Sequence, residues 1–269
     1  MHAIVLTLSW GGGRAYCAES ALTNPHKAND MTITPTTLFR AAGVAAALAG
    51  LIFLGVQINH PHLDATSIAT TDVMARNSLK MLMAALALAG ITGMYLRQVT
   101  KMGVLGLLGY GLFAAGFLSM LGTEFVAALV LPSIAHSANV YVDSVIAVAN
   151  NRPATGDIGL MRTAILFTGI AYVAGGFIFA IALFRANVLA RWAAVLLALG
   201  TVATIAVGLV PQYERLFAIP TGFALVALGY SLWRDQRAPA APPILDPVSS
   251  SEEKVAAAGS AVSSANSAP

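Results

Sequence analysis

The sequence predicts an all-α membrane protein: a polytopic bundle of six transmembrane helices with disordered tails. Two features of the composition indicate this fold class. Of the 269 residues, 57% are hydrophobic and only 10% are charged, and the mean hydropathy is +0.75. Soluble domains carry about 25% charged residues, because water must wet their surface. Most of the surface of this chain is therefore expected to contact lipid.

A third observation is a series of six long apolar runs separated by short polar or basic segments. An apolar helix of about 20 residues crosses a bilayer core of about 30 Å. The predicted spans cover residues 41–58, 79–96, 102–131, 160–184, 192–210 and 216–233. Arg40 precedes the first run and Arg97 ends the second, and basic residues at span ends are typical of membrane helices.

The longest run, from Met102 to Leu131, carries a single acidic residue, Glu124. A carboxylate inside a membrane needs a partner or water, which makes Glu124 the first candidate for function. About twenty residues from Met102 bring the helix to the far interface. Glu124 is therefore expected near that interface rather than at mid-bilayer.

The two ends of the chain differ from the membrane domain, which is predicted to cover residues 40–237. Residues 1–39 are expected to be a disordered tail, or an over-extended start upstream of a native start at Met31. The apolar piece Ala3–Trp10 lacks the basic region and the length of a secretory signal. Residues 238–269 are rich in Pro, Ala and Ser and hold too few large apolar groups to order themselves.

The longest internal connection, residues 133–159, is too apolar for a free loop. Val140, Val142 and Val145 belong to an apolar pattern that Pro153 interrupts. This pattern predicts an amphipathic helix that lies on the membrane surface or caps the bundle.

Six spans place both termini on the same side of the membrane. Cytoplasmic segments are enriched in Lys and Arg. With both termini inside, the inner basic residues are Arg40, Arg97, Lys101, Arg185, Arg191, Arg234 and Arg237. The outer ones are Arg76, Lys80, Arg152, Arg162 and Arg215. This bias favours a multi-pass protein of the cell membrane with a cytoplasmic N-terminus and a cytoplasmic C-terminus.

This threading places two opposite charges at a similar depth. Lys80 enters the second span from the outer side, and Glu124 leaves the third span near that side. We expect them to form an intramembrane ion pair, because each charge is costly alone in lipid. Arg162 is an alternative partner for Glu124. In the other interpretation, both side chains extend to the lipid headgroups.

The same outer layer contains candidate metal ligands. His60, His62, His136 and Glu124 supply the imidazole and carboxylate groups that suit zinc or iron. The alternative is that these are wet interface histidines, since no HExxH motif and no mid-span histidine is present. No bound cofactor is predicted.

Other classes of site find no support in the sequence. A single cysteine, Cys17, excludes an intrachain disulfide and a CxxC metal site. No nucleophile elbow, Walker loop or dinucleotide fingerprint is present, so no catalytic residue is assigned. The basic residues form no stripe, which argues against nucleic-acid binding. The predicted partner is the lipid bilayer.

Small residues recur every four positions in the first two spans. Ala42, Ala46 and Gly50 share one helix face, as do Ala85, Ala89 and Gly93. Such faces permit close helix contact. They would also suit a homo-oligomer or a membrane-protein partner.

Three segments resemble a family of uncharacterised bacterial multipass membrane proteins, a domain of unknown function. They are LFRANVLARWAAVLLALG at residues 183–200, GYSLWR at 229–234 and TEFVAALVLP at 123–132. The resemblance covers roughly residues 40–237. It implies a helical bundle in the cell membrane and no activity.

Three functions follow from these features. A structural or accessory membrane component is favoured, because the spans contain few buried polar groups. The first alternative is a small-solute or ion transporter with an outer vestibule at Glu124 and Lys80. The second is a membrane-embedded metal-dependent enzyme that uses the outer histidines. The sequence identifies neither a reaction nor a substrate.

Overall fold

A computed structural model of the chain describes residues 34–58, 64–205 and 214–235. Every regular element in these ranges is helical, which confirms the all-α prediction. The helices are α1 (Pro35–Gly55), α2 (Thr71–Arg97), α3 (Val99–Phe125), η1 (Val126–Val130), α4 (Leu131–Ile134), α5 (Asn139–Ala149), α6 (Leu160–Ala186), α7 (Arg191–Ala203) and α8 (Glu214–Asp235). Of these, η1 is a π-helical turn that continues α3 into α4.

Four helices are long and apolar enough to cross a membrane: α1, α2, α6 and the continuous segment from Val99 to Ile134. The predicted count of six spans is not confirmed, because α7 and α8 are not among these four. α7 has 13 residues and reaches about 20 Å, less than a bilayer core of about 30 Å. The remainder of the predicted fifth span, residues 206–210, lies outside the described residues.

The first helix begins earlier than the sequence predicts. α1 starts at Pro35, and the Thr34 side chain caps it by accepting a hydrogen bond of 3.2 Å from the Thr37 N–H. Proline suits the first helical position because its missing N–H has no partner there. Residues 35–39 therefore belong to the bundle rather than to a tail. Residues 1–33 and 238–269, where disorder is expected, lie outside the described residues.

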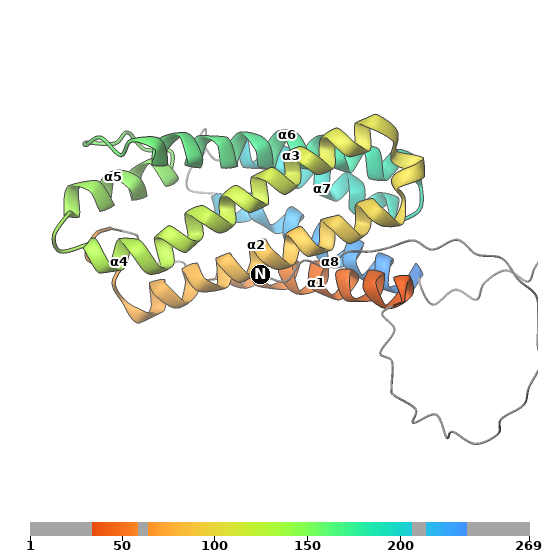
Figure 1. Cartoon of the computed structure of the whole chain (residues 1–269), viewed down its shortest axis with the longest axis horizontal. Helices are drawn as coiled ribbons and strands as arrows, with labels where there is room; N and C mark the ends of the chain where they lie inside the picture. Colours follow the sequence, from red (N-terminus) through yellow and green to blue (C-terminus); the bar gives the residue numbers. More distant parts are fainter. Residues whose placement is uncertain (1–33, 59–63, 206–213, 236–269) are drawn as a thin grey trace, which may run out of the picture. The chain divides into compact units, whose positions relative to one another are not determined.

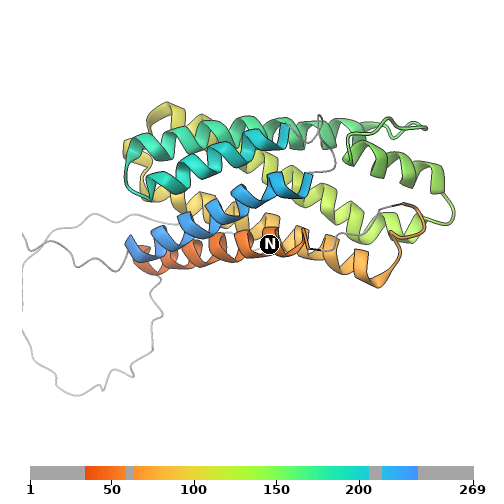
Figure 2. The same cartoon turned by 180° about the vertical axis from the view of Figure 1, so that it is seen from behind.

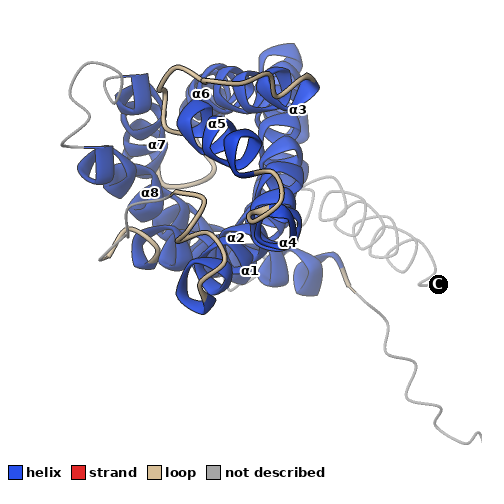
Figure 3. Cartoon of the chain, turned by 90° about the vertical axis from the view of Figure 1, so that its left-hand side faces the viewer, coloured by secondary structure: helices blue, strands red, loops and turns tan. Residues whose placement is uncertain are grey.

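The described helices form a closed ring. In order around it come α1, α2, α3, α6, α7 and α8, and α8 packs back against α1 (Figure 3). Figure 2 shows α8 lying between α1 and α7. The two ends of the bundle differ, since α4 and α5 lie at one end (Figure 1). We call this the α5 end, and the opposite end, where α2 stops at Arg97 and α8 at Asp235, the Arg97 end.

Two apolar clusters hold the bundle together. The main one fills the ring and includes Phe113, Phe117 and Phe179, all fully buried. The second lies at the α5 end, where Val142 and Val145 of α5 pack with residues of α4 and of the connections on either side. The connection 133–159 thus contains a helix that caps the bundle.

Glycines set the closest helix contacts. A Cβ added at Gly109 of α3 would lie 2.5 Å from the backbone nitrogen of Phe179 on α6, so only hydrogen fits there. The stripe Ala42, Ala46 and Gly50 of α1 is buried inside the chain. The second predicted stripe is only partly packed, because Ala85 and Ala89 are exposed while Gly93 is buried.

We predict that Gly109→Ala lowers the thermal unfolding midpoint, because the methyl group must push α3 away from α6 at a cost of about 1–3 kcal/mol. Gly111→Ala is the matched control, since its Cβ would meet nothing within 4 Å. It should leave the midpoint unchanged or raise it, because alanine stabilises a helix by up to about 1 kcal/mol over glycine. Equal midpoints for the two variants in one detergent would contradict the close contact.

Candidate functional site

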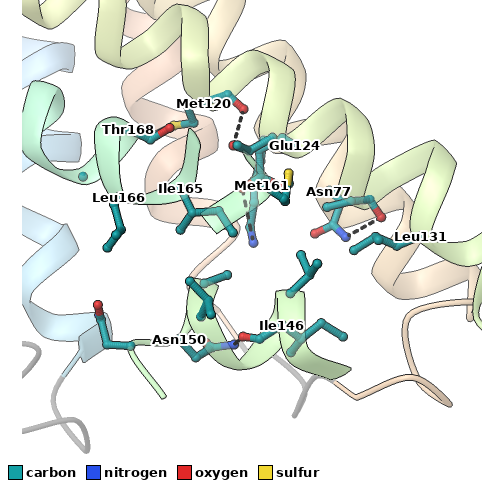
Figure 4. A pocket seen from close by; sticks show the side chains of 18 of the residues that line it. Asn77, Met120, Glu124, Leu131, Ile146, Asn150, Met161, Ile165, Leu166 and Thr168 are labelled. Atoms are coloured by element: carbon teal, nitrogen blue, oxygen red, sulfur yellow. Dashed lines mark hydrogen bonds and ion pairs between the residues drawn. The ribbon is translucent and has the colours of Figure 1, made fainter. Parts of the chain in front are cut away.

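A cavity of about 460 Å³ lies at the α5 end, between α2, α3, α5 and α6 (Figure 4). Most of its wall is apolar and comes from Ile, Leu, Met, Val and Ala side chains. Seven polar residues interrupt it: Asn77, Lys80, Thr123, Glu124, Asn150, Asn151 and Thr168. An apolar wall with a few convergent polar groups is the usual form of a small-molecule site.

Lys80 of α2 and Glu124 of α3 lie side by side on the wall of this cavity. Lys80 Nζ lies 4.0 Å from Glu124 Oε1, and the two side chains are 20% and 21% exposed. The separation is longer than a hydrogen bond, so this ion pair leaves each group free to accept a further partner. The structure therefore brings together the two charges that the sequence places at one depth.

The third predicted member of this group lies apart. Arg162 is exposed in the first turn of α6, and no ion pair of its side chain occurs within the described part of the chain. The position of Lys80 also differs from expectation. α2 begins at Thr71, so Lys80 lies about 14 Å along the helix rather than at its start.

A π-helical turn forms the cavity wall directly after Glu124. Pro132 has no N–H and its ring clashes with the carbonyl four residues earlier, so regular α-helical bonding cannot continue through this segment. The Leu131 N–H instead bonds to the Val126 carbonyl, five residues back. Such bulges are frequent at functional sites.

The π-helical turn leaves the Ala127 carbonyl free to accept a hydrogen bond from the buried Asn77 side chain. Asn77 of α2 is 3% exposed, and its Nδ2 donates a 3.3 Å hydrogen bond to the Ala127 carbonyl within the π-helical turn. Asn77 is not among the predicted site residues, although its polar side chain three residues before Lys80 places it on the same helix face. Figure 4 shows Asn77 beside Leu131, on the same side of the cavity as Glu124.

Hydroxyl groups connect α3 to α6 beside the cavity. Ser119 on α3 and Thr168 on α6 lie 2.7 Å apart at their side-chain oxygens, and Thr168 also donates to the Ala164 carbonyl. The Thr123 hydroxyl donates to the Met120 carbonyl. These hydroxyls make hydrogen bonds within the chain, whereas Lys80 and Glu124 are further apart than a hydrogen bond.

An aromatic cluster packs between α3 and α6, further from the α5 end than the residues that line the cavity. Phe113 and Phe117 of α3 lie 4.7 Å apart at their ring centroids, and Tyr172 of α6 lies 5.7 Å from Phe117. Phe117 and Phe113 precede Met120 by about one and two turns of α3, and Tyr172 follows Thr168 by about one turn of α6, whereas Met120 and Thr168 line the cavity. The cavity therefore faces the α5 end rather than crossing the bundle.

Polar contacts at the α5 end hold the cap in place. The Asp143 carboxylate of α5 accepts a 2.7 Å hydrogen bond from the Ala65 N–H in the connection before α2. In the same connection, Asp64 accepts bonds from the Thr66 hydroxyl and from the backbone of Ser67 and Thr66. The Thr66 hydroxyl bond is the largest effect, and together these bonds lower the pKa of Asp64 to about 2. The Asp64 carboxylate therefore stays ionised above that pH.

The predicted metal ligands do not form a site in the described structure. His136 is exposed in the turn between α4 and α5, while His60 and His62 lie outside the described residues. Within the ranges described, no three His, Cys, Asp or Glu side chains are placed to hold a metal ion.

Comparisons of this chain with protein-family models, with curated proteins and with solved structures find no match. The resemblance to a bacterial membrane family stays a prediction. Function must therefore be inferred from the geometry of the cavity.

We predict that Lys80→Met and Glu124→Gln each lower the free energy of unfolding, because each leaves one charge without its partner. The loss should be about 1–3 kcal/mol, below the figure for fully buried pairs, since both side chains are partly exposed. The double variant should recover about 1 kcal/mol relative to the sum of the single losses. Unfolding in nanodiscs measures these values.

Arg162→Gln is the control for this cycle, because Arg162 is a basic residue of the same region without an observed ion pair. It should change the unfolding free energy little. Strictly additive effects of the Lys80 and Glu124 changes would show that the two charges do not interact.

Proposed function

We propose that this chain is a multi-pass protein of the cell membrane that binds a small charged or zwitterionic solute in the cavity at the α5 end, as a step in transport. The observation that supports this proposal is the loose pair of Lys80 and Glu124 on the wall of a largely apolar cavity. A charged pair that is costly in lipid and still partly exposed is typical of a functional site in a membrane bundle.

The proposal includes six spans with both termini in the cytoplasm. The ring supports this count, because α7 and α8 complete it between α6 and α1 and run beside helices that are long enough to cross a bilayer. In this orientation the α5 end faces outward and the cavity is an outer vestibule. The basic residues Arg97, Arg185 and Arg234 then lie on the cytoplasmic side, as the positive-inside rule favours.

Transport is preferred here to the accessory function that the sequence favours. The small-residue stripe of α1, which suited a partner helix, packs inside the chain against α2 and α8. The cavity, in contrast, has the volume and the mixed lining of a ligand site. Passage beyond it requires the aromatic cluster to move, and the π-helical turn next to Glu124 is a segment where α3 already departs from regular bonding.

Cysteine labelling in intact cells tests the orientation and the open vestibule together. In a Cys17→Ser background, we predict that a membrane-impermeant thiol reagent modifies His136→Cys and, more slowly, Thr123→Cys in the cavity. Ala180→Cys, which is buried, and Lys101→Cys at the Arg97 end should stay unmodified. Labelling of Lys101→Cys but not of His136→Cys would show the opposite orientation. A Thr123→Cys variant that the reagent does not modify would exclude a water-filled vestibule.

Solute binding is tested by the unfolding midpoint of the protein in nanodiscs, measured with a panel of amino acids, inorganic ions and small organic ions. A solute at 100 times its Kd should stabilise the protein by about 2.7 kcal/mol. We predict that Gly169→Leu abolishes the effect, because Gly169 lines the cavity and its Cβ would meet nothing within 4 Å. A leucine side chain at this position of the cavity wall meets no backbone clash at its Cβ.

Gly111→Leu is the matched control, since Gly111 also has open space around its Cβ but does not line the cavity. It should retain the stabilisation. A solute effect that survives Gly169→Leu would place binding elsewhere, and the absence of any stabilising solute would favour the accessory function.

A further inference from the structure

A second concave feature lies on the outside of the ring at the Arg97 end. It is a groove of about 890 Å³ between α7 and α8, lined by Val188, Ala190, Trp192, Leu196, Phe223, Val226, Ala227, Tyr230, Ser231, Arg234 and Asp235. None of these residues contributes to the cavity described above. The groove is therefore a separate candidate site.

The burial pattern shows which way the groove faces. On α8, Leu225, Leu228 and Leu232 are fully buried in the ring, whereas Phe223 and Tyr230 are 53% and 55% exposed. The exposed residues occupy the helix face opposite the core. In a chain that spans a membrane, such a face contacts lipid.

The groove is apolar along its length and charged at one end. Phe223 and Arg234 are eleven residues apart on α8, which corresponds to about 16 Å along the helix axis. Trp192 and Tyr230 flank the groove, and such amphipathic rings are enriched where acyl chains meet headgroups. The groove thus matches an acyl chain that ends in a headgroup near Arg234.

The charge at this end favours an anionic headgroup. Arg234 is exposed, and its acidic neighbour Asp235 is held by Arg97, with Nε to Oδ2 at 2.7 Å. Arg185 and Arg191 lie nearby in sequence at the junction of α6 and α7. The Ala190 N–H donates to Ser231 Oγ at 3.0 Å, which fastens this junction to α8 and fixes the end of the groove.

We propose that the α7–α8 groove binds an anionic phospholipid of the bilayer, with an acyl chain along Phe223 and Leu196 and the phosphate beside Arg234. Basic pockets between helices on the cytoplasmic side commonly bind such lipids. The groove proposal rests on the membrane orientation proposed above, but it does not depend on solute binding in the cavity. Failure of the solute test therefore leaves the lipid proposal standing, and the lipid test can fail while a solute still binds.

Trp192 lines the groove, so its fluorescence reports whether a lipid occupies the groove. With Trp10→Phe and Trp233→Phe it is the only tryptophan, and the protein is placed in phosphatidylcholine vesicles that contain brominated lipid, which quenches indole fluorescence on contact. Brominated phosphatidylglycerol is compared with brominated phosphatidylcholine at equal mole fraction. We expect the groove to prefer the anionic lipid about fivefold, the effect of one basic residue near a charged headgroup.

Arg234→Gln should reduce this preference to about one, and Arg234→Lys should keep it. Arg185→Gln is the matched control, because Arg185 is exposed at the same end but does not line the groove. An equal loss in Arg185→Gln would show a general surface charge effect and overturn the proposal, as would equal quenching by both lipids. Quenching that appears only after truncation at Arg237 would show that the C-terminal segment covers the groove, which also overturns it.

Discussion

Closure of the helical ring depends on the contact between α1 and α8, the first and the last helices described. At Gly43 an added Cβ would lie 2.7 Å from the Gly229 carbonyl, and at Gly229 it would lie 2.5 Å from the Gly43 carbonyl. Glycine on both sides lets the two backbones approach, and van der Waals packing at such contacts drives helix association where lipid supplies no hydrophobic effect. With this contact the core residues of all six ring helices face one interior.

The ring places a polar site inside an apolar bundle without leaving its groups isolated. α2 directs Asn77 and Lys80 inward, and α3 presents Glu124 and the carbonyl that the π-helical turn exposes. Each polar group has a partner from the neighbouring helix, which offsets the cost of removing it from water. Both contacts are long, at 3.3 Å and 4.0 Å, which is compatible with the solute site proposed above.

The two ends of the bundle differ in where their charged side chains lie. At the α5 end Lys80 and Glu124 line the cavity, and Asp143 ties the capping helix α5 to the connection before α2. At the Arg97 end Arg234 is exposed beside the α7–α8 groove, and Arg97 and Asp235 join α2 to α8. The first arrangement suits a solute that enters from water, and the second suits a lipid that approaches from the bilayer.

Sequence alone determined the helical class, the apolar runs and the two charges worth pairing, because hydropathy and helix length are local properties that each segment carries by itself. It also placed Lys80 and Glu124 at one depth, since depth follows from counting residues along a span. It did not identify Asn77. A single polar residue in a polar segment is expected to be solvent-exposed, and only the packing of α3 beside α2 shows that Asn77 is buried.

Only the tertiary structure decided which helix faces meet. It assigned the small-residue stripe of α1 to the contacts with α2 and α8, created the cavity beneath α5 and directed the Asn77 amide to the Ala127 carbonyl. Pro132 was visible in the sequence, but the acceptor that its π-helical turn exposes gains a partner only through the packing of α2. The physical reason is that contacts between helices depend on shape at each crossing, and shape is not encoded in hydropathy.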